Sequence, residues 1–226
     1  MKAKTTTTKT PPKLFNDRYR IIRPLASGGF GQTFLAEDTQ MPSSRYCVIK
    51  RLKPFSNTPE MRQIVRDRFR REAIALEKLG NNSDRIPQLY AYFERRGQFY
   101  LVQEWIKGET LLDRVKQYGL FGEGEVKSIL MKILPVLDYI HQRGIIHRDI
   151  KPDNIMWRHS DRQPVLIDFG AVKETMGTTI DSQGKVVGSV VIGSSGFMAS
   201  EQASGRPTFC SDIRSEERRV GKECRS

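Results

Sequence analysis

Apolar residues follow two different periods along the chain, and these periods divide it into a strand-rich part and a helical part. Residues 19–25, 33–37 and 45–52 have strand character around a glycine-rich turn, and residues 98–106 form a fourth such run. Residues 61–79 and 126–140 instead repeat apolar side chains at helical spacing. Strands first and helices later predict an α+β fold with two lobes.

Several local signals predict where the helices begin and end. Asn57 and Thr58 offer a cap before Pro59, which suits the first position of a helix. Residues 107–108 should form a turn into a short helix. Gly144 is expected at the C-terminal cap of the second long helix, and Pro135 predicts a kink within it.

Two charged residues interrupt apolar stretches where burial would be costly. Glu72 falls between Phe69 and Leu76 on the apolar stripe of the first helix, and Lys50 ends the apolar run of residues 47–49. A buried carboxylate or ammonium is stable only with an oppositely charged partner. We therefore predict that Lys50 and Glu72 pair. The alternative is that the two residues do not pair, and that each buries the apolar part of its side chain while its charged group reaches solvent.

Length and composition limit the class of protein. The chain has 226 residues, of which 38% are hydrophobic, and this is enough to bury a core. Three cysteines are too few for a disulfide framework or a zinc site and fit a reducing, cytoplasmic location. Residues 1–18 are rich in Thr and Lys and predict a disordered basic tail, not a secretory signal. No apolar run approaches the length of a membrane span.

The formal net charge of +12 raises the question of a nucleic-acid partner. Much of this charge lies in the tail and on the first helix, at Arg62, Arg66, Arg68, Arg70 and Arg71. Basic residues on a helix are usually a solvated face, and no aromatic residues are interleaved with them for base stacking. We therefore expect no nucleic-acid partner.

The strongest chemical signal lies between residues 147 and 170. Residues 147–154 read His-Arg-Asp-Ile-Lys-Pro-Asp-Asn, and residues 168–170 read Asp-Phe-Gly. Asp149 can accept a hydroxyl proton, and Lys151 can neutralise a phosphoryl oxygen. Asn154 and Asp168 offer oxygen atoms to Mg²⁺. An ordinary polar turn between two strands would not need all these groups together.

These motifs resemble the catalytic loop and the metal-binding turn of protein kinases. The resemblance covers residues 19–213 and is strongest to eukaryotic-like serine/threonine kinases of cyanobacteria. It implies a β-rich N-lobe at about 19–103, a hinge at 104–108 and a helical C-lobe at 109–213. Lys151 matches the serine/threonine class, so the resemblance implies transfer of the ATP γ-phosphoryl group to protein hydroxyls with Mg²⁺.

The resemblance also implies a role for each catalytic residue. Asp149 would deprotonate the substrate hydroxyl with Lys151 beside it, Lys50 would grip the α- and β-phosphates, and Glu72 would hold Lys50. Two other functions stay open. One is a non-catalytic kinase-fold scaffold or ATP-binding module, although such proteins usually lack one of these residues. The other is a small-molecule phosphotransferase, which is disfavoured by Lys151-Pro152 and by the end-of-segment motif at residues 193–201.

Nucleotide contacts follow from the same resemblance. The phosphate-covering turn would consist of Leu25, Ala26, Ser27, Gly28, Gly29, Phe30, Gly31 and Thr33. Glycines there let backbone amides approach phosphate oxygens. Ala26 and Thr33 depart from the usual glycine and valine. The adenine contacts would be Val48, Met156, the Glu104 carbonyl and the Ile106 amide.

Other family features map onto the helical part. Residues 170–193 would be the activation segment, whose candidate autophosphorylation sites are Thr175, Thr178, Thr179, Ser182 and Ser189. Leu76, Leu89, His147 and Phe169 match the apolar stack that joins the lobes. Asp212 would brace the backbone of the catalytic loop.

The last thirteen residues, 214–226, match an in-frame translation of a sequencing-library adapter. We expect them to be an artefact joined to a truncated gene. The alternative is a genuine basic tail. The C-lobe would then be incomplete and would lack the arginine that pairs with Glu201 in the family. An uncovered apolar face would make this chain poorly folded and weakly active or inactive.

Overall fold

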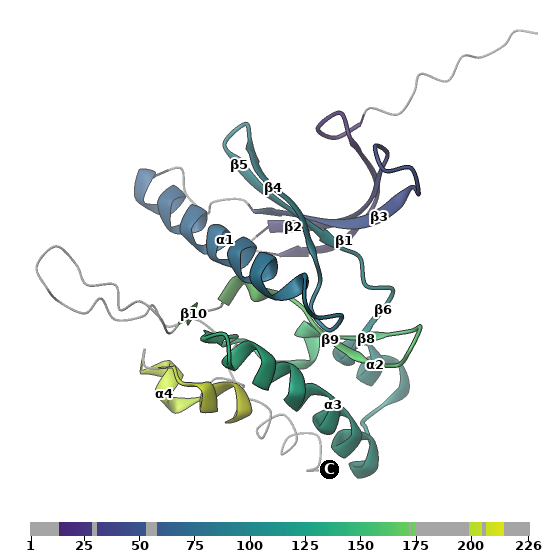
Figure 1. Cartoon of the computed structure of the whole chain (residues 1–226), viewed down its shortest axis with the longest axis vertical. Helices are drawn as coiled ribbons and strands as arrows, with labels where there is room; N and C mark the ends of the chain where they lie inside the picture. Colours follow the sequence, from purple (N-terminus) through teal and green to yellow (C-terminus); the bar gives the residue numbers. More distant parts are fainter. Residues whose placement is uncertain are drawn as a thin grey trace, which may run out of the picture.

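The computed structural model of the protein describes residues 14–28, 31–52, 58–171, 173–174, 199–204 and 207–214. Its first part is an antiparallel sheet in the order β1-β2-β3-β5-β4. The strands are β1 (Tyr19–Gly28), β2 (Gly31–Asp38), β3 (Arg45–Leu52), β4 (Leu89–Arg95) and β5 (Gln98–Glu104). Helix α1 (Pro59–Gly80) crosses one face of this sheet (Figure 1).

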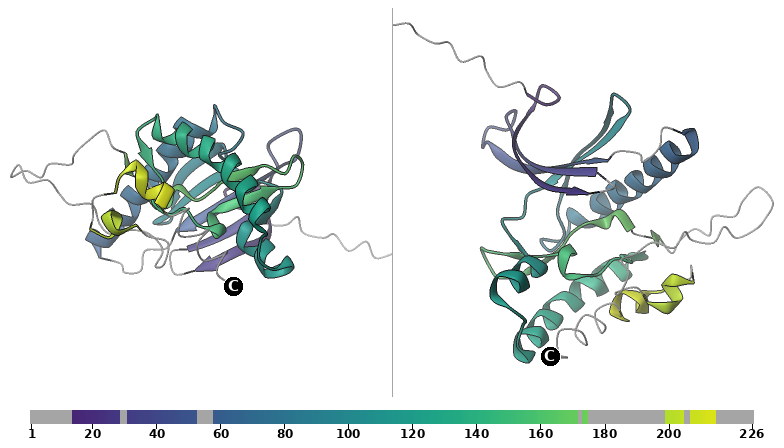
Figure 2. Two further views of the ribbon diagram at one scale, coloured as in Figure 1. Left: turned by 90° about the horizontal axis from the view of Figure 1, so that it is seen from below. Right: turned by 180° about the vertical axis from the view of Figure 1, so that it is seen from behind.

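The second part is mainly helical and lies on the other side of α1 (Figure 2). Its helices are α2 (Leu111–Tyr118), α3 (Glu123–His141) and α4 (Ser200–Ala203), and residues 209–214 are also helical. Its short strands are β6 (Gly108–Thr110), β7 (Ile145–Ile146), β8 (Ile155–Arg158), β9 (Pro164–Leu166) and β10 (Lys173–Glu174). Two 3₁₀ turns are η1 (Pro152–Asn154) and η2 (Phe169–Ala171). The α+β fold with two lobes is therefore confirmed.

One apolar core runs through both lobes. It includes Phe69 and Leu76 of α1, Leu101 of β5, Ile133 of α3 and Phe169 of η2, all of them buried. Because the core is continuous, the position of α1 depends on the helical lobe as well as on the sheet. None of the described helices combines the length and apolar character that a membrane span requires.

A second apolar cluster covers the opposite face of the sheet. Cys47 and Ile49 of β3 belong to it, whereas Lys50 points to the α1 side, as the alternation of a strand requires. Phe15 packs on this outer cluster, with its ring centroid 4.8 Å from that of Tyr100 and 6.2 Å from that of Phe93. Phe15, which the sequence placed in a disordered tail, therefore has packing partners. Residues 1–13 lie outside the described residues.

The boundaries differ from the sequence-based prediction in several places, and β1 and β2 are each longer than predicted. Strand β4 was not predicted, although Gly97 marks a tight turn between two aromatic-rich runs and has φ +70°. Strand β5 ends at Glu104, two residues early, and β6 begins at Gly108 where a turn was expected. Helix α3 ends at His141, three residues before Gly144, which nevertheless has φ +71°. Helix α1 does begin at Pro59, as predicted.

Candidate functional site

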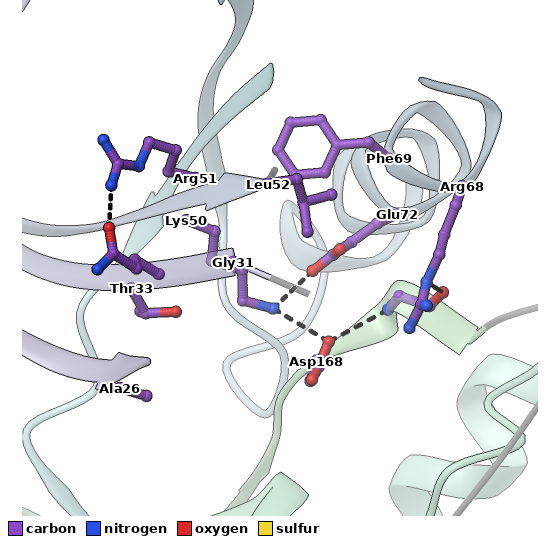
Figure 3. A pocket seen from close by; sticks show the side chains of 12 residues that line it. Ala26, Gly31, Thr33, Lys50, Arg51, Leu52, Arg68, Phe69, Glu72 and Asp168 are labelled. Carbon is purple, nitrogen blue, oxygen red and sulfur yellow. Dashed lines mark hydrogen bonds and ion pairs between the residues drawn. The ribbon is translucent and has the colours of Figure 1, made fainter. Parts of the chain in front are cut away.

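Lys50 joins three elements at the boundary between the lobes. Its Nζ atom lies 2.6 Å from Glu72 Oε1 on α1 and 3.2 Å from Asp168 Oδ1 before η2. Figure 3 shows the lysine reaching from β3 toward both carboxylates. The pair that the sequence predicts is thus present, and Asp168 makes it a set of three charges.

The three charges shift one another's pKa values. The Lys50 ammonium lowers the pKa of Asp168 to about 2, so this carboxylate is ionised at neutral pH. Burial opposes the charge of Lys50, but the charges of Asp168 and Glu72 outweigh it and raise the Lys50 pKa above its usual value. Burial raises the pKa of Glu72, and Lys50 only partly offsets this effect. The lysine therefore stays charged beside an ionised Asp168.

These residues line a cavity of about 210 Å³ between the sheet and α1. Its lining is Ala26, Gly31, Gln32, Thr33, Lys50, Arg51, Leu52, Arg68, Phe69, Glu72, Asp168 and Gly170. At Gly31, φ is +150° and a Cβ atom would collide with the Arg51 carbonyl oxygen. Only glycine fits this close approach of two strands, so Gly31 fixes how β2 and β3 meet at the cavity.

Arg68 does not lie on the solvated face that the sequence predicts for the arginines of α1, because it is half-buried. Its Nε atom donates a hydrogen bond to the Gly170 carbonyl at 2.7 Å. It lies one helical turn before Glu72, so both side chains project from the same face of α1 toward η2. Helical spacing relative to Glu72 is the signal that could have identified it.

The catalytic-loop residues form a second group in the helical lobe. Asp149 Oδ2 accepts a hydrogen bond from Asn154 Nδ2 at 2.9 Å and lies 3.0 Å from Lys151 Nζ. Asn154 Nδ2 also donates to the Asp149 carbonyl at 2.8 Å, which fixes η1 against the loop. The geometry holds one carboxylate between an amide and a cation.

The backbone before Asp149 is held by a buried acid, as the resemblance implied. Asp212 is 0% exposed and accepts hydrogen bonds from the His147 amide at 2.9 Å and the Arg148 amide at 2.7 Å. His147 stacks edge-on against Phe169, with ring centroids 4.9 Å apart. Burial lowers the pKa of His147, so its imidazole is neutral at pH 7.

The neutral form of His147 also agrees with its neighbours. Its Nδ1 atom can accept from the Asp149 amide at 3.4 Å, while Nε2 can donate to the Ile167 carbonyl at 3.2 Å. This assignment of the tautomer follows from the partners. The predicted apolar stack is present as well, since Leu76 and Phe169 are in the core and Leu89 packs against it.

Several predicted nucleotide contacts do not line the cavity. Leu25 is 38% exposed, Val48 and Ile106 are buried, and Glu104 and Met156 are half-buried. No hydrogen bond to the Ile106 amide occurs within the described residues. Ser27 is exposed, and Gly28 ends β1. Gly29 and Phe30 lie outside the described residues, as do the five candidate phosphorylation sites.

The environment of Glu201 differs from the sequence-based expectation. The arginine that pairs with this glutamate in the family is expected to be missing, but Arg214, the first residue of the segment assigned to the adapter, lies with its Nη1 atom 2.7 Å from Glu201 Oε2. Glu201 Oε1 also accepts a hydrogen bond from Ser211 Oγ at 2.8 Å. The helical turn at 209–214 brings Arg214 to the face that carries Ser211, because the two are three residues apart.

Comparison with known proteins gives a consistent result. A family model described as protein kinase domain matches residues 19–212. Serine/threonine-protein kinase PknA of Nostoc sp. is 58% identical over 201 residues, covering 89% of this chain and 36% of that protein. Serine/threonine-protein kinase C of Synechocystis sp. is 59% identical over 204 residues, covering 90% and 38%. The chain therefore spans little more than a third of the length of these curated relatives.

Proposed function

Because the chain belongs to the protein kinase family, we propose that it transfers the γ-phosphoryl group of ATP to serine or threonine hydroxyls of proteins. The observation that carries this proposal is the set of contacts around Lys50, which joins Glu72 of one lobe to Asp168 of the other. In phosphoryl transfer most catalysis comes from positioning and from charge placed around the phosphates. A lysine held between two carboxylates is positioned for that task.

The substrate hydroxyl would meet Asp149. Its carboxylate is the acceptor for the hydroxyl proton, and Asn154 and Lys151 hold it in place. Lys151 would also neutralise charge on the transferred phosphoryl group. The names of the relatives, which are serine/threonine-protein kinases, support the same class of hydroxyl for this chain.

The nucleotide would lie between the glycine-rich turn and the boundary of the lobes. Lys50 would contact its α- and β-phosphates, with the backbone of residues 25–31 above them. The Glu104 carbonyl and the Ile106 amide would bind the edge of the adenine, between Val48 and Met156. We place the N-lobe at 19–103, the hinge at 104–108 and the C-lobe at 109–213 on this basis.

Protein kinases use a divalent metal ion, and we propose Mg²⁺. Asn154 and Asp168 supply amide and carboxylate oxygens, the hard donors that Mg²⁺ prefers. The described residues contain no group of three or more His, Cys, Asp or Glu ligands. This fits an ion that takes its other ligands from ATP phosphates and water. When bound, the ion would neutralise phosphate charge. Lys50 and Lys151 would add two further positive charges near the same phosphates.

The test is phosphorylation of a generic protein substrate by the 226-residue chain with Mg²⁺ and ATP. We expect Asp149→Asn to lower kcat by about 10²–10⁴-fold, because the proton acceptor is lost. Asp153→Asn in the same loop is the matched control, since Asp153 is exposed. Equal activity of the Asp149→Asn variant and wild type would contradict the role of Asp149 as the proton acceptor in catalysis. ATP binding without any transfer would agree both with the weak or absent activity that the sequence predicts for this chain and with a non-catalytic ATP-binding module.

A further inference from the structure

Arg148, the residue before Asp149, has an unfavourable backbone conformation. Its φ angle is +68°, in the left-handed region that residues with a side chain seldom adopt. Such a conformation persists only where the surroundings hold it. The groups that bind the Arg148 backbone therefore determine how Asp149 is presented.

Two buried side chains hold this backbone at both of its polar groups. The Arg148 amide donates to Asp212 Oδ1 at 2.7 Å. The Arg148 carbonyl accepts a hydrogen bond from Gln202 Nε2 at 2.5 Å. Asp212 is 0% exposed and Gln202 is 1% exposed, so water does not replace either contact.

The carbonyl contact acts directly on Asp149. The Arg148 carbonyl belongs to the peptide plane that joins Arg148 to Asp149, and that plane is rigid. Fixing the carbonyl therefore fixes the amide of Asp149 and the direction in which its side chain leaves the backbone. Asp212 holds the peptide plane on one side of Arg148, and Gln202 holds the plane on the other side.

We propose that Gln202 is a positioning residue for Asp149, acting through its hydrogen bond to the Arg148 carbonyl. The proposal rests on the proposed function, in which Asp149 accepts the substrate proton. Gln202 lies on α4, directly after Glu201 and before the helical turn that carries Asp212. The segment after the activation segment thus supplies both groups that hold the strained residue.

Hydrogen exchange tests the contact without requiring activity. Gln202→Met keeps the length of the side chain but removes the donor. We expect faster exchange of the amides of residues 147–149 in this variant than in wild type. Ser204→Ala is the matched control, because Ser204 is exposed at the end of the same helix. Unchanged exchange in Gln202→Met would overturn the proposal.

Kinetics then test the consequence for catalysis. We expect Gln202→Met to lower kcat by about 10–100-fold with little change in the KM for ATP, because Asp149 is displaced while the nucleotide contacts stay. A change confined to KM, or an equal loss in Ser204→Ala, would contradict a positioning role. If wild type transfers no phosphate, the proposed function fails for this chain, in line with the weak or absent activity that the sequence predicts, and the exchange experiment still decides whether Gln202 holds the Arg148 carbonyl.

Gln202→Glu separates a hydrogen-bonding role from a packing role. An ionised carboxylate would repel the Arg148 carbonyl, whereas a protonated one can donate to it, and burial favours the protonated form. We expect the ratio of variant to wild-type kcat to rise as the pH is lowered from 8 to 6. A ratio that stays constant with pH would show that only packing matters at this position.

Discussion

At the scale of single residues, the site contains buried charged side chains that are stable only because oppositely charged groups lie beside them. Lys50 and Glu72 could be predicted because each interrupts an apolar pattern, and an unpaired buried charge is too costly to occur. The contribution of Asp168 to the same lysine could not be predicted from periodicity, because the two residues are 118 positions apart. Contacts of this separation depend on how the lobes pack.

A pH dependence of stability follows from His147, which is 0% exposed. Burial lowers its pKa below the usual value of 6.5. The unfolded chain therefore binds a proton below about pH 6.5 while the folded chain does not. The free energy of unfolding therefore decreases as the pH is lowered. We expect wild type to lose more stability than His147→Gln between pH 7 and pH 5.5, by up to about 1 kcal/mol.

Urea unfolding at the two pH values measures this difference. The variant keeps a donor for the Ile167 carbonyl but cannot titrate in this range. His159→Gln is the control, because His159 is exposed. Equal pH slopes for wild type and His147→Gln would contradict a neutral, buried imidazole.

At the scale of elements, two arginines fix the connection between α1 and β4 to the helical lobe, and one of them, Arg158 of β8, binds Asp84. Arg85 donates to the Pro164 carbonyl at 2.9 Å, to Gln163 Oε1 at 2.8 Å and to the Lys132 carbonyl at 3.1 Å. Its planar guanidinium group thereby joins α3 and the β8–β9 turn to the connection between α1 and β4. The amphipathic stripe of α1 predicts the helix itself, but not this anchor, because arginine carries no periodic signal.

Replacing the Arg85 guanidinium group should loosen α1 relative to the helical lobe. We expect Arg85→Met to lower the free energy of unfolding by about 2–4 kcal/mol, because three acceptors lose a charged donor. Arg85→Lys should recover only part of this loss, since an ammonium cannot span three acceptors in a plane. Chemical denaturation measures both, with exposed Arg162→Met as the control. A loss of the same size in Arg162→Met would contradict the anchor.

At the scale of the whole molecule, the two lobes share one core and meet at Lys50. The order of strands and helices along the chain was enough to predict the two lobes, since the strands form one sheet and the later helices pack with one another. The sequence did not predict where Arg214 lies. Its ion pair with Glu201 arises from the turn at 209–214, which brings the two together across the end of the helical lobe.

A ligand that contacts both lobes should stabilise them together. We expect ATP with Mg²⁺, at one hundred times its Kd, to stabilise the chain by about 2.7 kcal/mol. Chelation of the metal should remove part of this effect, because the phosphate charges near Asp168 are then less neutralised. Thermal unfolding measures the shift.

Lys50→Met should abolish most of this stabilisation, since the contact between the lobes and the phosphates is lost. Lys116→Met, on an exposed position of α2, should leave it intact. The prediction fails if Lys50→Met responds to the nucleotide as wild type does.

The position of Phe15 has a practical consequence for anyone who handles the molecule. Its ring lies on the outer face of the sheet, against Tyr100 and Phe93, whereas Lys50 and the cavity lie on the inner face. Phe15 therefore lies on the side of the sheet that is turned away from the cavity. A probe attached at position 15 itself would therefore be separated from the cavity by the sheet.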